Sequence, residues 1–294
     1  MTLIDFYRQV VRFGRLADPR KDKRKIKSFP DSALLFGRPD IRVSKIMVGI
    51  DIEVAELLLA DCIRQKEGLD LVVAHHPEGK AYTGLHEVMQ LQVDLLVQAG
   101  VARQTAAKLL EDRMQEVQRR VLPANHTRPV DAARLLNMPF LNMHTPADNH
   151  VFQYLDSLFK RNAKKIRRVE DIVALIREIP EYKIAAKFNT GPRIILGSPK
   201  RPAGKILLEM TGGTEGSKDV FDKLYKAGVR TLVSMHLSEE HFKKVKDANL
   251  NVVIAGHVSS DTLGMNLLLD NIERAERQEF EVVNCSGFTR IKRK

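Results

Sequence analysis

Residues 71–77 read Leu-Val-Val-Ala-His-His-Pro, so two adjacent histidines end a short apolar run and meet a proline. Such a run before a proline is typical of a buried strand that stops there. The same pattern, an apolar or β-branched run that stops at a histidine, occurs three more times. Ligands collect at the carboxyl ends of parallel strands and imidazole is the commonest metal ligand, so the repetition predicts a metal site. The histidines are His75, His76, His144, His236 and His257.

The rest of the chain alternates between helical and strand-like patterns. Helices are expected over residues 3–16, 53–66, 84–99, 102–122, 130–136, 218–226, 238–247 and 259–273, and in two pieces within 151–177. Strands are expected over 43–50, 70–74 and 139–143, before His236 and His257, and at the edge over 280–284; residues 193–196 and 205–210 are expected to form a hairpin. This alternation predicts an α/β fold, a layered α/β/α arrangement around a mixed, mostly parallel sheet.

Length and composition set the class of protein. The 294 residues suit a single α/β unit, or two lobes (about 1–150 and 151–294) with the metal site between them. No apolar run reaches the eighteen residues of a membrane helix, and the acid Asp5 interrupts the start of the chain where a signal peptide is apolar. We therefore expect no membrane partner and a cytoplasmic location. The two cysteines form no spaced pair, which argues against sulfur-rich zinc sites.

The excess of basic residues raises the question of a nucleic-acid partner. Lysine and arginine outnumber the acids by 48 to 37, which gives a net charge of +11. The richest basic run, residues 20–27, lies in an expected loop and has no interleaved aromatic residues, so stacking on single strands is not indicated. A solvated basic surface is the preferred interpretation, and no motif supports nucleic-acid binding.

Two histidine–acid segments accompany the histidine pair. On a regular strand His75 and His76 would point to opposite faces, so both reach one site only if the strand ends there. Residues 144–148 directly follow a strand, so we expect a loop in which Asp148 either binds metal or bonds backbone amides in a turn. In residues 256–261, a helix that starts near His257 would place Asp261 on the same face; if Ser259 is instead the helix cap, Asp261 lies in the first turn.

Together, these candidates supply three imidazole nitrogens and two carboxylates. That set suits zinc, manganese or iron rather than a purely oxygen-bound ion. Five ligands are too many for one open tetrahedral centre but suit two divalent metal ions that share a carboxylate or a water. The predicted metal ligands are His75, His76, Asp148, His257 and Asp261.

Other residues are candidates for substrate binding and proton transfer. The glycine-rich residues 211–217 open a helix after a strand, where free amides can bind phosphate, although a tight turn is an equal alternative. Lys205 and Lys218 lie close by in sequence, and His236 is the candidate catalytic residue, as a proton shuttle. The substrate or anion-binding candidates are Thr211, Gly212, Gly213, Thr214 and His144.

Four ordered motifs carry a family resemblance that runs from about residue 43 to residue 280. They are Ala74-His75-His76-Pro77, His144-Thr145-Pro146-Ala147-Asp148, Thr211-Gly212-Gly213, and Gly256-His257 with an acid four residues later. The chain resembles the Nif-three-like family, whose members are often described as GTP cyclohydrolase type 2 homologues. The resemblance implies a layered α/β fold, a two-metal centre on the five predicted ligands and a toroidal homohexamer.

The chain departs from the family pattern at three places. It has Pro146-Ala147 where the family usually shows Asn-Leu, the shorter Asp261 where the family usually has glutamate, and His236 where the family often has an acid.

Two functions are compatible with these residues. The first is a metal-dependent hydrolase that uses metal-activated water on a small substrate, with nucleotides and purine derivatives as candidates. The second is a non-catalytic metal-binding regulatory protein with a nucleic-acid or protein partner.

Overall fold

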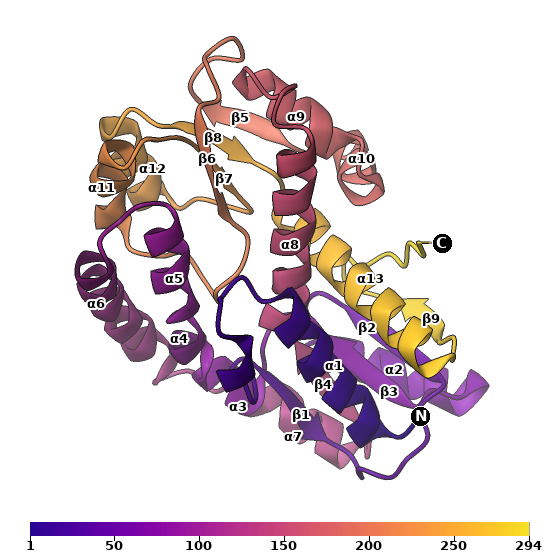
Figure 1. The fold of residues 1–294 in the computed structure, drawn as a ribbon. Coiled ribbons are helices and arrows are strands. Elements are labelled where there is room, and N and C mark those ends of the chain that lie inside the picture. The colour runs from indigo at the N-terminus through magenta and orange to yellow at the C-terminus, as the bar shows by residue number, and fades with distance from the viewer. Residues whose placement is uncertain (294) are drawn as a thin grey trace. The chain divides into compact units, whose positions relative to one another are not determined.

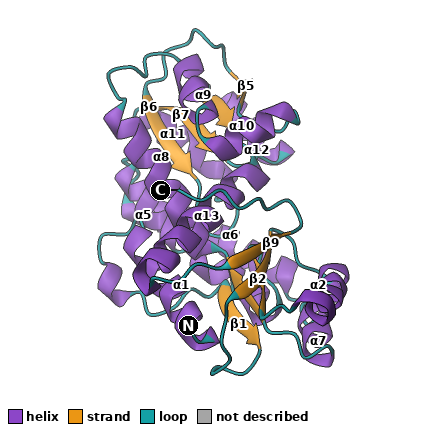
Figure 2. Ribbon diagram, turned by 90° about the vertical axis from the view of Figure 1, so that its right-hand side faces the viewer, coloured by secondary structure: helices purple, strands orange, loops and turns teal. Residues whose placement is uncertain are grey.

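The computed structural model describes residues 1–293 (Figures 1 and 2). The helices are α1 (Leu3–Ala17), α2 (Val54–Glu67), α3 (Gly79–Thr83), α4 (Leu85–Val88), α5 (Leu91–Gln98), α6 (Arg103–Val121), α7 (Arg128–Leu135), α8 (Thr145–Arg161), α9 (Val169–Arg177), α10 (Pro180–Lys187), α11 (Phe221–Lys226), α12 (Glu239–Asp247) and α13 (His257–Glu276), with 3-10 turns at Lys23–Lys25 and Lys218–Val220. The strands are β1 (Ser32–Phe36), β2 (Lys45–Gly49), β3 (Leu71–Ala74), β4 (Phe140–Met143), β5 (Arg193–Leu196), β6 (Lys205–Glu209), β7 (Val229–Ser234), β8 (Asn251–Ile254) and β9 (Glu281–Asn284). Within residues 1–293 no helix has the length and apolar character needed to span a membrane.

The chain divides into two compact units, and neither is continuous in sequence. The first unit is Met1–Val88, Glu116–His150 and Asp261–Lys294; the second is Met89–Gln115 and Val151–Ser260. The C-terminal residues belong with the first unit, and a segment around α5 belongs with the second. The expected lobes, about 1–150 and 151–294, stay a prediction.

The sheet of the first unit has the strand order β1-β4-β3-β2-β9. Strands β2, β3, β4 and β9 are parallel, and β1 runs antiparallel to β4 with Ser32 opposite Met143. The carboxyl ends of β2, β3 and β4 therefore share one edge of the sheet, and the amino end of β1 lies at that same edge. The predicted α/β fold with a mixed, mostly parallel sheet is confirmed.

Helices cover both faces of this sheet because side chains along a strand alternate between faces. Ile46 and Val48 of β2 pack with residues of α1 and α13, whereas Met47 packs with residues of α2 and α7. Figure 1 shows α1 in indigo beside α13 in yellow, at opposite ends of the chain. Gln9 of α1 donates a hydrogen bond to Glu276 of α13 at 2.5 Å.

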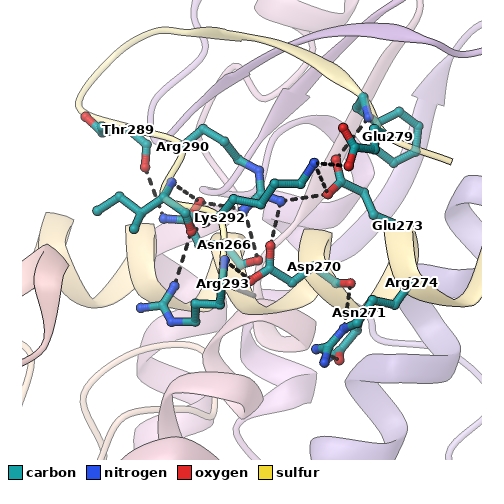
Figure 3. A network of polar contacts seen from close by, with 12 residues as sticks. Asn266, Asp270, Asn271, Glu273, Arg274, Glu279, Thr289, Arg290, Lys292 and Arg293 are labelled. Atoms are coloured by element: carbon teal, nitrogen blue, oxygen red, sulfur yellow. Dashed lines mark hydrogen bonds and ion pairs between the residues drawn. The ribbon is translucent and has the colours of Figure 1, made fainter. Parts of the chain in front are cut away.

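The C-terminal segment holds α13 through a network of ion pairs and hydrogen bonds (Figure 3). The Arg290 guanidinium lies 2.6 Å from the Asp270 carboxylate and 2.9 Å from that of Glu273, and both acids are buried. Lys292 adds a second cation 3.3 Å from Glu273, and Asn266 donates to the Thr289 carbonyl at 3.0 Å. These contacts hold the C-terminal segment against α13.

The sheet of the second unit has the strand order β5-β8-β7-β6, with β6, β7 and β8 parallel and β5 antiparallel to β8. The predicted hairpin between β5 and β6 is wrong, because β8 and β7 lie between these two strands. The connection does not fold back. Instead, Val169 donates its backbone N–H to the Arg201 carbonyl, and Ala203 donates to that of Arg167, so the connection runs along the start of α9.

Candidate metal centre

The histidine pair follows directly on the end of β3. Beyond Ala74, the backbone N–H of His75 donates to the Gly49 carbonyl at 2.9 Å, and that of His76 donates to the Ile50 carbonyl at 3.0 Å. The regular strand stops at this bend, as the sequence predicts, and the two imidazole rings lie 5.2 Å apart. Both rings can therefore reach the same site.

Two buried carboxylates lie beside this pair within the first unit. His75 Nε2 is 3.4 Å from an oxygen of Asp148 and 3.4 Å from an oxygen of Asp261. His76 Nε2 is 3.7 Å from the other oxygen of Asp261. The structure thus brings together four of the five predicted ligands. His75, Asp148 and Asp261 each contribute one potential ligand atom, and these three atoms lie within 4.8 Å of one another.

The donor set fits a cation. Among the described residues, both ring nitrogens of His75 lack a hydrogen-bond partner, and so does Oδ1 of Asp148. The 3.4 Å contact between His75 Nε2 and Asp148 Oδ1 does not have hydrogen-bond geometry. Burial would lower the pKa of His75, but the carboxylates of Asp261 and Asp148 outweigh it and raise the pKa to about 10. Buried carboxylates need a positive partner, which is either a proton on His75 or a metal ion. These groups can hold a metal ion.

Asp148 reaches the site from a helix and not from the expected loop. Helix α8 begins at Thr145, and the N–H groups of Ala147 and Asp148 both donate to the His144 carbonyl, at 2.8 and 3.1 Å. The loop prediction is wrong because Pro146 does not prevent a helix here. In the first turn the missing proline N–H would have no intrahelical partner, so proline is tolerated there.

Asp261 is fully buried in the first unit, one helical turn after the start of α13 at His257. The spacing of four residues places both side chains on one face of the helix. The alternative with Ser259 as helix cap is wrong, because its hydroxyl donates to the Gly256 carbonyl inside the first turn. The division between the units falls after Ser260, so His257 belongs to the second unit, where its ring lies 4.8 Å from that of His236.

Two further carboxylates support histidines at this edge, and the sequence analysis missed both. Asp51 lies 2.6 Å from Nδ1 of His76, and Asp31 lies 2.8 Å from Nδ1 of His144. Asp51 follows the end of β2, so the strand-end pattern could have identified it. Asp31 precedes β1, whose amino end reaches this edge only because the strand is antiparallel.

Acidic side chains also lie around the exposed side of His76. Burial and the nearby carboxylates of Glu53 and Asp51 raise the pKa of Glu78 to about 7, against the opposing effect of Arg128. Arg128 also forms an ion pair with Glu53. The surroundings of His76 therefore attract cations.

The glycine-rich residues 211–217 form a tight turn in the second unit. Gly212 and Gly213 have φ angles of 103° and 87°, and a Cβ on Gly212 would lie 2.7 Å from Cγ of Gln92. The Gln92 amide donates to the carbonyls of Gly212 (2.8 Å) and Thr214 (2.6 Å). Because Glu215 lies within this turn, an anion there would meet a carboxylate, and anion binding by Thr211–Thr214 stays a prediction.

The two lysines expected near a substrate phosphate are already engaged. Lys205 donates to the Ala99 carbonyl at 2.6 Å, and Lys218 donates to Glu240 at 2.5 Å. His236, the candidate proton shuttle, has a partly exposed side chain and lies 3.5 Å from Glu215. Its catalytic role also stays a prediction.

Comparisons with known proteins give matches to solved structures. No model of a known protein family matches the chain, and no curated protein does. A NIF3 superfamily protein from Sphaerobacter thermophilus has a similar structure, with a TM-score of 0.80 and 28% sequence identity over 98% of each chain. Reduced HcgD from Methanocaldococcus jannaschii (TM-score 0.55, 13% identity, 97% of each chain) and the protein TTHA1606 from Thermus thermophilus (TM-score 0.51, 13% identity, 97% of each chain) share the fold.

The likeness to the Sphaerobacter protein extends over nearly the whole of both chains. It agrees with the four ordered motifs, two of which, His75-His76 and His144 to Asp148, meet at one edge of the first sheet. Together, the likeness and the motifs support a Nif3-like family for this chain.

Proposed function

We propose that the protein is a dinuclear-metal-dependent hydrolase that acts on a small, nucleotide-derived substrate. The observation that carries the proposal is the buried group His75, Asp148 and Asp261, in which ligand atoms converge without mutual hydrogen bonds. His76 adds a partly exposed imidazole to this group, and His257 is the fifth proposed ligand. Zinc, iron and manganese are the candidate metals for this set.

The chain's own residues would hold and orient the reacting groups. When bound, a metal pair supplies Lewis acidity to a substrate oxygen and lowers the pKa of an attacking water. Asp51 accepts the Nδ1 proton of His76 and so turns Nε2 toward Asp261. The buried side chains of His75 and Asp148 exclude bulk water, whereas His76 is the ligand that a substrate can approach.

Metal content tests the centre. Protein purified without added metal, then loaded with zinc, should hold about two ions per chain by elemental analysis. Asp148→Ala should lose metal, whereas Asp156→Ala, which removes a carboxylate paired with Lys160 on the same helix, should not. Equal metal content in wild type and Asp148→Ala would overturn the centre.

Turnover tests the hydrolase assignment. The metal-loaded protein should hydrolyse at least one member of a panel of nucleotides, phosphoesters and cyclic amides, and Asp148→Ala should not. Metal binding without any turnover would favour the regulatory alternative. A salt-dependent affinity for DNA or RNA that survives His75→Ala would point to a nucleic-acid partner.

The proposal extends to assembly. The family resemblance implies a toroidal homohexamer, and light scattering coupled to gel filtration should give six chains per particle. A monomer at micromolar concentration would contradict this part of the proposal but would leave the metal centre intact.

A further inference from the structure

His144 is held by a buried carboxylate on the side of the ring that faces away from the metal centre. Its Nδ1 lies 2.8 Å from Oδ2 of Asp31, and the Thr145 hydroxyl donates to the same oxygen at 2.7 Å. Asp31 is fully buried and His144 nearly so. Because a carboxylate accepts hydrogen bonds, Nδ1 of His144 carries a proton, and whenever the ring is neutral its Nε2 presents a lone pair.

That lone pair faces other acceptors. His144 Nε2 lies 3.8 Å from Oδ2 of Asp148, and the His144 ring centroid is 4.9 Å from that of His75. Two acceptors that face each other in a buried site repel unless a cation lies between them. The three imidazoles of His75, His76 and His144 each offer a nitrogen within 4.8 Å of the others.

The same arrangement occurs at His76, a proposed ligand. There the Asp51 carboxylate accepts a hydrogen bond from Nδ1 of His76, and Nε2 of the same ring faces Asp261. A carboxylate that holds the far nitrogen of a histidine fixes the tautomer and makes the near nitrogen a better metal donor. The alternative role of His144, binding an anion, requires a positive charge free of acids, and Asp148 lies too close for that.

We propose that His144 is an additional ligand of the metal centre through Nε2, and that Asp31 is its positioning residue. This proposal rests on the proposed metal-dependent function. It also accounts for β1, whose antiparallel direction brings Asp31 to the edge where the parallel strands end.

Metal titration with paired variants tests it. Zinc affinity, measured by competition with a chelator, should fall about 10–100-fold in Asp31→Asn. It should fall at least as far in His144→Gln, which leaves Asp31 in place. Two controls should keep wild-type affinity: Asp40→Asn, which removes an exposed carboxylate paired with Arg38, and His86→Gln, whose imidazole bonds a backbone carbonyl.

Nitrogen NMR of histidine-labelled wild type needs no variant and reads out the tautomer directly. Before zinc, His144 should show a proton on Nδ1; after zinc, its Nε2 resonance should shift as a metal-bound nitrogen while Nδ1 keeps its proton. An unshifted Nε2 with unchanged affinity in both variants would overturn the proposal. If wild type binds no zinc at all, the proposed function fails; if wild type binds and His144→Gln binds equally, only this inference fails.

Discussion

The two units each contain a cluster of histidines and carboxylates, and the two clusters differ in how their polar atoms are satisfied. In the first unit, His75 lies between Asp148 and Asp261 without hydrogen bonds to them. In the second unit, Glu215 accepts the backbone N–H of Ser238 at 2.5 Å and lies 3.4 Å from Nδ1 of His241. The first cluster depends on a positive charge, either a proton on His75 or a metal ion, whereas the second is largely satisfied by donors of its own.

The pKa values follow this difference. Burial would raise the pKa of Glu215, but hydrogen bonds from His236 and Ser238 outweigh it and lower the pKa to about 2. His241 is itself held, because its Nε2 donates to the Gly216 carbonyl at 2.9 Å. Among residues 1–293, this cluster contains no three ligand atoms that converge as those of the first unit do. Residue types alone therefore do not identify a metal site; the direction of the donors does.

The largest expected effect is stabilisation by metal in the first unit. At a free zinc concentration 1,000 times the Kd, wild type should gain about 4 kcal/mol of unfolding free energy over chelated protein. Asp148→Asn should lose most of this gain, yet should be no less stable than wild type in chelator, because it removes one of two buried carboxylates and leaves the protonated His75 paired with Asp261. Urea unfolding with and without zinc measures both the stabilisation by zinc and the stability in chelator.

A carboxylate outside the cluster provides the control. Asp219→Asn, in an exposed ion pair of the second unit with Lys244, should keep the full zinc effect. If Asp148→Asn retained the whole zinc stabilisation, the cation of the first unit would have to bind elsewhere.

A second buried acid pair in the first unit sharpens the comparison, because here the chain supplies the cation itself. Asp270 and Glu273 share the Arg290 guanidinium (Figure 3). Arg290→Met should lower the unfolding free energy by about 3 kcal/mol, since it leaves two buried carboxylates short of a partner. Arg274→Met, an exposed residue on the same helix, should change it by less than about 0.5 kcal/mol. If the two variants lost equal amounts of unfolding free energy in urea, the burial of Asp270 and Glu273 would not determine how much Arg290 stabilises the protein.

Much of the site could be predicted because it follows strand ends. The apolar run before His75 and the proline after His76 locate the end of β3, and the same pattern locates His144. Parallel strands place these ends at one edge, so residues far apart in sequence meet there. The acid four residues after His257 follows from helical periodicity alone.

Other parts of the site depend on contacts that no local pattern encodes. Asp31 is at the site because β1 pairs antiparallel with β4, a choice made by side-chain packing across the sheet and not by residues 30–36 themselves. The hairpin prediction failed for a related reason, because β5 finds its partner in β8. Two neighbouring strands in sequence need not be neighbours in a sheet.

Two glutamates of the second unit provide a matched pair. Glu215→Gln should lower the unfolding free energy at pH 7 by about 2 kcal/mol, because the charged form is the one that its donors stabilise. The pKa of Glu215 is lowered on folding, so its contribution is present above about pH 4.5 and is lost as the pH falls toward 2.

Burial raises the pKa of Glu209, and its Oε2 has no hydrogen-bond partner among the described residues. The sign is therefore opposite: its contribution is largest at low pH and is lost as the pH rises through the folded-state pKa. Glu209→Gln, a neutral mimic, should leave stability at pH 7 within about 1 kcal/mol of wild type or raise it. Equal losses in the two glutamine variants, measured by urea unfolding, would contradict the contrast between a satisfied and an unsatisfied carboxylate.

The smallest effect tests whether a histidine near the first cluster, but without a carboxylate, behaves differently from His75. Burial lowers the pKa of His150 to about 4, so the folded protein keeps this ring neutral while the unfolded chain protonates it below about 6.5. Stability should therefore fall by about 1 kcal/mol from this residue between pH 6.5 and 5.5. His150→Gln should remove that part of the slope and His86→Gln should not, as measured by urea unfolding at both pH values. An unchanged slope in His150→Gln would mean that the ring is protonated when folded, as expected only for a histidine with an acidic partner such as His75.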